Sequence, residues 1–273
     1  MTKSVEGFRA LGQIGPITLG EMDCVKLMNR VDTKYLTSVG VLERVLEEAL
    51  RQGYRALVVE GSKISPYNSL YYDTPSLGMF LDHHNRRSLR QKVRTRVYLA
   101  SGATFLEIKR KNNKGRTKKK RMQIPPDEFW DFRCDSAAAL FLAEKSRYTS
   151  QDIAPRLETI FRRITLVNRS MTERLTIDFD LRFVNHDTGM EASLGPAVII
   201  ELKQDGRVPS EMKGILLDLR VKPVRISKYC IGTTLTNPFV KSNRFRTKVH
   251  AIEKTTGQRI TIIPQSTQKS IES

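Results

Sequence analysis

The sequence predicts an α+β protein built around a closed antiparallel β-barrel, with the charged faces of its strands turned inward and helices covering the outside. Three observations lead to this prediction. Several segments alternate ionisable and aliphatic residues, amphipathic stretches lie between them, and most of the basic excess falls within residues 86–121, much of which alternates in this way. An inward charged face requires an anionic ligand, because like charges on neighbouring strands repel one another.

The basic excess is large and local. The chain of 273 residues has 47 Lys and Arg against 29 Asp and Glu, a net charge of +18. Residues 86–121 contain 15 basic residues and a single acid, Glu107. Such a charge calls for a polyanionic partner, which could be nucleic acid, an anionic membrane or a phosphorylated small molecule.

Six segments show the period-two alternation expected of strands. They are residues 30–35, 92–98, 105–111, 161–166, 174–181 and 200–203. Ser101-Gly102 is a plausible turn between the second and third, which predicts a hairpin. A single charged strand face is usually only a solvated surface, but six together favour a barrel whose charged faces meet an anion.

Three amphipathic stretches are expected to cover the barrel. Residues 41–50 carry an apolar stripe behind Ser38 as a candidate N-cap, and residues 126–145 and 210–219 are similarly apolar on one side. The predicted class is therefore α+β, since strands outnumber helices and are interrupted by them.

The expected organisation is a main domain over residues 1–236, a basic and possibly helical extension over 237–254, and a disordered tail over 255–273. No apolar run is long enough for a membrane span, and the first twenty residues do not resemble a signal peptide. The three cysteines are far apart, which is expected of small buried residues in a reduced protein. These features lead us to expect a cytoplasmic protein.

Motifs for several other kinds of binding and catalysis are not found in the sequence. The chain has no P-loop and no visible Ser-His-Asp or Cys-His set, and His83-His84 is interpreted as part of a loop. Tyr98 and Phe105 are too few aromatics for a single-strand stacking platform, so no specific nucleic-acid partner is expected. Residues 114–121 could still form a basic loop that grips any polyanion.

Eight short motifs, in order, resemble the VTC domain, the polyphosphate polymerase module of the triphosphate tunnel metalloenzymes. They lie at residues 30–35, 71–74, 92–98, 106–109, 119–121, 161–163, 200–203 and 227–229. The resemblance implies an eight-stranded antiparallel tunnel with a basic lumen. It also implies transfer of the ATP γ-phosphate onto a growing polyphosphate with a divalent metal, usually Mn²⁺, with Mg²⁺ as the alternative.

The resemblance assigns roles to residues at matching positions. The principal phosphate-contacting residues are Lys34, Arg94, Arg96, Lys109, Arg163 and Lys228. Further phosphate contacts are expected at Arg30, Lys92, Lys111, Lys119, Arg121, Lys203 and Ser227. Glu201 matches the metal-binding glutamate. Phe161 departs from the family, some members of which have a tyrosine there, so a hydroxyl contact is lost.

The assigned residue types suit phosphoryl transfer, in which positioning and electrostatic stabilisation supply most of the catalysis. Arginine forks bind phosphate in a bidentate manner, and one carboxylate can anchor a metal that also binds phosphate oxygens. Glu107, Asp178 and Asp180 either assist that metal or hold the basic side chains by ion pairs.

Three functions stay open at this stage. The first is a polymerase that uses ATP, or another nucleoside triphosphate, and inorganic polyphosphate. The second is a hydrolase of triphosphate or nucleoside triphosphates, and the third is a binding module for polyphosphate or another polyanion. The strongly basic strand faces favour the polymerase, because they suit long anionic chains. A membrane partner that takes up the product is also possible.

Overall fold

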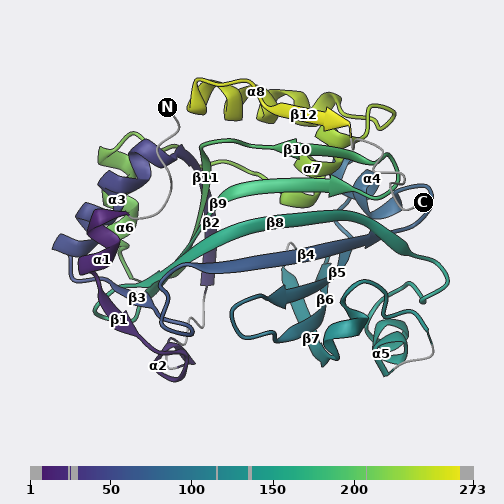
Figure 1. Ribbon diagram of the computed structural model, residues 1–273, viewed down its shortest axis with the longest axis horizontal. Coiled ribbons are helices and arrows are strands. Elements are labelled where there is room, and N and C mark those ends of the chain that lie inside the picture. Colours follow the sequence, from purple (N-terminus) through teal and green to yellow (C-terminus); the bar gives the residue numbers. More distant parts are fainter. Residues whose placement is uncertain are drawn as a thin grey trace, which may run out of the picture.

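The computed structural model describes residues 8–23, 25, 30–114, 116–134, 137–206 and 208–264, and one strongly curved sheet forms its centre (Figure 1). Eight strands follow one another across this sheet, and every neighbouring pair is antiparallel. In spatial order they are β2 (Arg30–Ser38), β11 (Ala197–Asp205), β9 (Glu173–Asn185), β8 (Ala154–Val167), β4 (Ser65–Asp73), β5 (Arg90–Tyr98), β6 (Thr104–Lys111) and β7 (Thr117–Ile124).

Four shorter strands extend the sheet at two places. On one side β10 (Met190–Ser193) pairs with β9 and with β12 (Thr261–Pro264). On the other, β3 (Arg55–Leu57) pairs with β8 and runs parallel to β1 (Gly15–Ile17). These additions lie away from the path of the eight long strands.

The predicted class and the antiparallel order of eight strands are confirmed, but the predicted closure is wrong. Among the described strands, β2 pairs with β11 alone and β7 with β6 alone, so the barrel is open between β2 and β7. Alternation determines which face each side chain occupies. Closure depends on strand tilt and stagger, which the alternation does not specify.

Helices pack on both faces of the sheet, in three groups. The first contains α1 (Arg9–Gln13), α3 (Val39–Arg51) and α6 (Glu211–Asp218), and the second contains α4 (Gly78–His84), α7 (Lys228–Thr236) and α8 (Asn243–Thr256). The third contains η1 (Pro126–Phe129) and α5 (Ala137–Lys145), which pack over β4, β5 and β6. The short α2 (Leu19–Asp23) follows β1. The first and third groups cover the outer, aliphatic face, as expected. The second group packs on the inner face, against residues such as Tyr71 and Ile199 that share this face with Arg94 and Asp178.

The sequence explains most of these helices. In α3, Leu42, Val45, Leu46 and Ala49 form one stripe and are all fully buried. Ser38 does occupy the N-cap position of that helix but makes no side-chain capping bond. In α6 the capping bond is present, because the Ser210 hydroxyl accepts from the backbone N–H of Lys213.

The stretch 126–145, expected as one helix, is interrupted between η1 and α5. Two carbonyls near the interruption accept side-chain hydrogen bonds. Thr95 Oγ1 donates to Phe129 O at 2.7 Å, and Tyr72 Oη donates to Trp130 O at 3.0 Å. Phe132 is fully buried beside Tyr72. These tertiary contacts stabilise a non-helical backbone after η1.

Two further expectations need correction. His83-His84 lies in α4 and not in a loop, because the carboxylate of Asp73 accepts from the backbone N–H groups of Met79 and Phe80 at the start of that helix. Residues 255–264, expected within a disordered tail, end α8 and form β12, which pairs with β10. The rest of that tail lies outside the described residues. Within the described part of the chain, every helix is too short or too polar to cross a membrane.

Candidate active site

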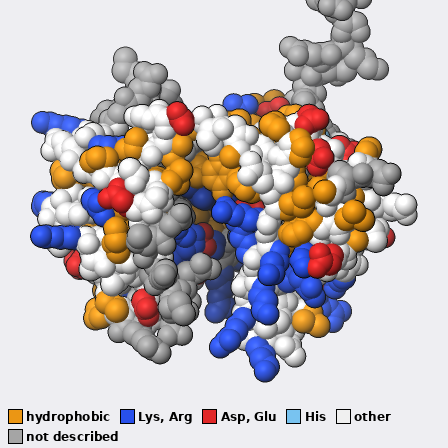
Figure 2. Space-filling view, turned by 90° about the horizontal axis from the view of Figure 1, so that it is seen from below, with side chains coloured by type: hydrophobic (Ala, Val, Ile, Leu, Met, Phe, Trp, Pro, Cys, Tyr) orange, Lys and Arg blue, Asp and Glu red, His pale blue; other side chains and the backbone are white. Residues whose placement is uncertain are grey.

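The inner face of the sheet lines a basic groove with a volume of about 880 Å³. Figure 2 shows Lys and Arg side chains gathered along the deep hollow between two lobes of the molecule. Thirteen Lys and Arg residues and three carboxylates are among the described residues that line it. A ligand for this groove must therefore be strongly anionic.

Strand register brings the basic residues of β5, β6 and β7 together, because paired residues on neighbouring strands share a face. Arg94 on β5 lies opposite Glu107 on β6, which lies opposite Arg121 on β7. The adjacent row consists of Lys92, Lys109 and Lys119. Three lysines in direct cross-strand register repel one another, so this row favours a bound anion.

Glu107 is a fully buried carboxylate between two cations. Arg94 donates to Glu107 Oε2 from Nε at 2.8 Å and from Nη2 at 2.5 Å, and Lys119 donates to Oε1. Burial alone would raise the pKa of Glu107, but the charges of Arg94, Arg96 and Lys119 outweigh it and hold the pKa far below its ordinary value. The carboxylate is therefore ionised and fixes the guanidinium of Arg94, whose Nη1 also donates to the Tyr71 hydroxyl at 2.7 Å.

Asp178 on β9, like Glu107, holds two basic side chains by ion pairs. Arg163 donates to its two oxygens from Nε at 2.5 Å and from Nη2 at 2.8 Å, and Lys228 donates to Oδ2. Burial opposes ionisation of Asp178, yet the charges of Arg163 and Lys228 lower its pKa. The ammonium of Lys228 also lies 4.8 Å from the centre of the Phe161 ring.

Arg96 and Lys109 have no carboxylate within 4.0 Å among the described residues. Arg96 donates from Nε to Ser69 Oγ at 2.9 Å. Burial, and next the charge of Arg94, lowers the pKa of Arg96, whereas the pKa of Lys109 is lowered first by Arg94 and next by burial. A bound phosphate would relieve this crowding, so these two side chains are the best placed to receive one.

Glu201 is the candidate metal ligand, and it lies between two lysines. Its Oε1 is 2.9 Å from Lys34 Nζ and its Oε2 is 3.6 Å from Lys203 Nζ. Burial opposes ionisation, but Lys203 and Lys34 hold the pKa of Glu201 well below its ordinary value. Burial, and next the charges of Arg163 and Arg174, lower the pKa of Lys203 to about 8, although the Glu201 carboxylate opposes this shift.

No group of three or more His, Cys, Asp or Glu residues gathers as a metal cage in the described ranges. Glu201 nevertheless fits a metal that takes most of its ligands from the substrate. Mg²⁺ and similar ions are commonly held by one or two carboxylates together with phosphate oxygens. Such an ion would compete with Lys34 and Lys203 for the Glu201 oxygens.

The end of the groove is formed by the N-terminus of α7. Ser227 is the N-cap of this helix, and its hydroxyl oxygen accepts from the Cys230 N–H at 3.3 Å and from Lys92 Nζ at 2.6 Å. The hydroxyl hydrogen remains for a further acceptor. Lys111 also lines the groove, as does Arg121, whose guanidinium lies 4.9 Å from the Phe105 ring centre.

The structure therefore brings the sequence-predicted site residues into one groove, except Arg30, whose side chain lies outside the described residues. Their roles stay predictions. Glu107 and Asp178 do hold basic side chains by ion pairs. Asp180 lies elsewhere, 3.3 Å from Arg162 Nη1, because a bulge at residues 160–162 and a left-handed backbone at Asp180 (φ 52°) break the alternation.

The groove residues missing from the predicted site include Tyr67, Tyr71, His83, Arg90 and Arg174. Arg90 continues the alternation of β5, so extending that strand could have found it, whereas Arg174 begins the alternating segment 174–181 and lies opposite Lys203. Tyr67 faces Phe161 across β4 and β8, with ring centres 5.3 Å apart. No sequence signal pointed to His83, which reaches the groove from α4.

An open, eight-stranded antiparallel sheet with a basic inner face is a fold of the triphosphate tunnel type. The family model of the VTC domain matches residues 29–237, which is most of the chain. The chain therefore belongs to the VTC domain family. A comparison with curated proteins found no match.

Solved structures with a similar arrangement are distant in sequence. An adenylyl cyclase candidate from Hippeastrum with a dominant triphosphatase activity is 15% identical with a TM-score of 0.47, and the match covers 75% of this chain and 95% of that one. An adenylate cyclase candidate from Vibrio parahaemolyticus is 11% identical with a TM-score of 0.45, covering 74% and 96%. A protein from Pyrococcus horikoshii is 14% identical with a TM-score of 0.44, covering 75% and 97%.

Proposed function

We propose that this protein is a metal-dependent polyphosphate polymerase that transfers the γ-phosphate of ATP onto inorganic polyphosphate. The observation that carries the proposal is the groove itself, in which Arg and Lys residues from several strands converge with few carboxylates to neutralise them. Membership of the VTC domain family supports it.

The proposed reaction joins a terminal oxygen of the polyphosphate chain to the γ-phosphorus of ATP. The bond from the γ-phosphorus to the bridging β,γ-oxygen breaks, and ADP leaves with that oxygen. The transition state is loose and spreads negative charge over the equatorial oxygens. Arg96 and Lys109 would bind these oxygens directly, because neither is neutralised by a carboxylate within reach in the described residues.

Arg94 and Arg163 would provide fixed donors, since Glu107 and Asp178 hold their guanidinium groups in place. Preorganised donors of this kind are worth about 3–4 kcal/mol each in other active sites. Lys34, Lys228 and Ser227 would bind neighbouring phosphates along the same groove. A nucleotide held mainly by its phosphates implies loose base specificity.

The proposed cofactor is a divalent cation, with Mn²⁺ favoured and Mg²⁺ as the alternative, and Glu201 would hold it. When bound, such an ion neutralises phosphate charge and orients the reacting groups. Lys34 and Lys203 would then be released from Glu201 to bind phosphate oxygens, since they contact its carboxylate in this structure.

The test is to incubate the pure protein with ATP, Mn²⁺ and a polyphosphate primer and to separate the products on a gel that resolves chain lengths. The proposal predicts a ladder of longer chains and an equal amount of ADP. Orthophosphate without a ladder would instead show a hydrolase, and unchanged ATP would show a binding module.

A further inference from the structure

A second basic cluster lies where the groove reaches α4, α7 and α8. We call it the outer cluster, and it consists of Arg86, Arg90, Lys92, Arg225 and Lys248. Arg90 and Lys92 belong to the groove lining, and Lys92 contacts Ser227. Arg86 follows Asn85, the C-cap of α4, and Arg225 lies two residues before Ser227.

Packing of α8 on α4 brings Lys248 to this place. The Lys248 ammonium lies 5.1 Å from the centre of the Phe245 ring, which itself lies 6.2 Å from the His83 ring. Arg244 on α8 also donates to the His84 carbonyl at 3.3 Å. Burial lowers the pKa of Lys248, and the charges of Arg86, Lys92 and Arg225 lower it further.

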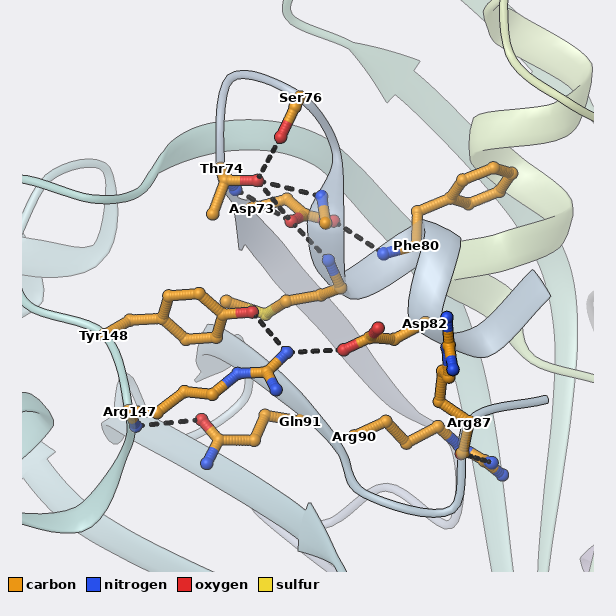
Figure 3. A network of polar contacts seen from close by, with 12 residues as sticks. Asp73, Thr74, Ser76, Phe80, Asp82, Arg87, Arg90, Gln91, Arg147 and Tyr148 are labelled. Carbon is orange, nitrogen blue, oxygen red and sulfur yellow. Dashed lines mark hydrogen bonds and ion pairs between the residues drawn. The ribbon is translucent and has the colours of Figure 1, made fainter. Parts of the chain in front are cut away.

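The outer cluster has no neutralising carboxylate. None of its five residues has an ion pair within 4.0 Å with any described acid. Asp82, the acid on α4, is already bound to Arg147, as Figure 3 shows. The same figure shows Arg90 directed toward the backbone at Arg87, where its Nη1 donates to the carbonyl at 2.7 Å. Beside the cluster, His83 Nδ1 is buried without a hydrogen-bond partner.

Arg86 has a backbone conformation that favours glycine, with φ of 58°. An arginine there costs about 1 kcal/mol relative to glycine. A cation at a helix C-terminus recovers about 0.3–1 kcal/mol of this, which accounts for one basic residue but not for five.

We propose that the outer cluster is a second phosphate subsite, which holds the part of a polyphosphate chain that extends beyond the groove. The proposal rests on the polyphosphate function proposed above and adds a preference for long chains. Arg96 and Arg90 are six residues apart on β5, a separation of about 20 Å. Lys92 lies opposite Lys109 and so joins the two regions. A chain of three phosphates is much shorter than about 20 Å, so only a longer chain can contact both Arg96 and the Arg90 end of the outer cluster.

Lys248 lies beyond residue 237, where the match to the family ends. The C-terminal extension would therefore supply one wall of this subsite, and chain-length preference would depend on α8.

The test compares the binding of tripolyphosphate and of long-chain polyphosphate by calorimetry, without ATP. The variants are Arg86→Gly, which suits the left-handed backbone, and Lys248→Glu. Their control is Arg246→Glu on the same helix, because two residues turn a helix by about 200° and carry the side chain away from the cluster. We expect the double variant to lose about tenfold in affinity for the long chain and about twofold or less for tripolyphosphate. Arg86→Gly should melt no lower than the wild type.

Equal losses for both ligands, an equal loss in Arg246→Glu, or no loss for the long chain would each overturn the subsite. The two proposals can fail separately. Length-dependent binding without ATP-dependent elongation would overturn the polymerase and leave the subsite. Elongation together with length-independent binding would overturn the subsite and leave the polymerase.

Discussion

Lys34 Nζ lies 2.9 Å from Glu201 Oε1, and the two residues face each other across the paired strands β2 and β11. Glu201 is thereby kept ionised and directed into the groove by its neighbours. The expected metal ligand is thus in place before any substrate arrives.

Glu201→Gln should remove metal-dependent turnover while keeping the fold. The amide can still accept a hydrogen bond from Lys34 but is a poor metal ligand, so we expect kcat to fall by about 10²–10³-fold. Metal-free binding of tripolyphosphate should be kept or strengthened, because a negative charge is gone. Turnover assays with circular dichroism check this, and full activity in the variant would show that Glu201 is not the metal ligand.

Arg94 and Arg96 should respond differently to alanine substitution. Arg94→Ala leaves the buried Glu107 carboxylate with Lys119 as its remaining ion-pair partner among the described residues, so we expect it to lower the free energy of unfolding by about 3–5 kcal/mol. Arg96→Ala removes a cation without a carboxylate partner and should change the stability by about 1 kcal/mol or less. Urea unfolding measures both.

The same two variants should share a loss of tripolyphosphate affinity, of about 30-fold or more for each. Lys254→Ala, on the exposed end of α8, serves as the matched loss of one positive charge and should bind nearly as well as the wild type. Comparable losses in all three variants would indicate diffuse attraction by the whole surface.

Asp178 should make the protein sensitive to acid. Its folded pKa is depressed below the ordinary 3.8, so its contribution to stability is present above that pH and declines as the pH falls toward the folded value. Asp178→Asn should be about 3 kcal/mol less stable at pH 7, because Arg163 and Lys228 lose their carboxylate. The difference from the wild type should shrink below pH 4 in urea titrations, and a constant difference would contradict the assignment.

Lys203 should couple phosphate binding to proton uptake near pH 8. Its pKa is depressed to about 8, so the unfolded chain binds more protons than the folded one between that pH and the ordinary 10.5. The ligand-free protein should therefore gain stability from Lys203 as the pH rises through this window. Tripolyphosphate favours the charged amine, so affinity should fall above pH 8. Lys203→Met should flatten both profiles, and unchanged profiles in that variant would assign the titration to another group.

Much of the site was predictable from the alternation of residues along the strands. Arg94, Arg96 and Lys109 alternate with aliphatic neighbours, so one buried aliphatic face places all of them on the other. The ion pairs of Glu107 and Asp178 follow from cross-strand register, which the sequence suggests but does not specify.

The differences from prediction arise from long-range contacts. The bulge at residues 160–162 moves Asp180 away from the groove, and the open edge between β2 and β7 depends on strand stagger. Folding of β12 depends on β10, some seventy residues earlier, and local composition cannot reveal that partner. His83 reaches the groove because of the position of α4, a helix whose first turn is capped by the Asp73 carboxylate.

The most direct test of the central claim is a crystal structure with tripolyphosphate and Mn²⁺. We predict three phosphates within the groove, in contact with Arg96 and Lys109, with the metal bound to Glu201. Phosphates on the outer surface beside an empty groove would contradict the account.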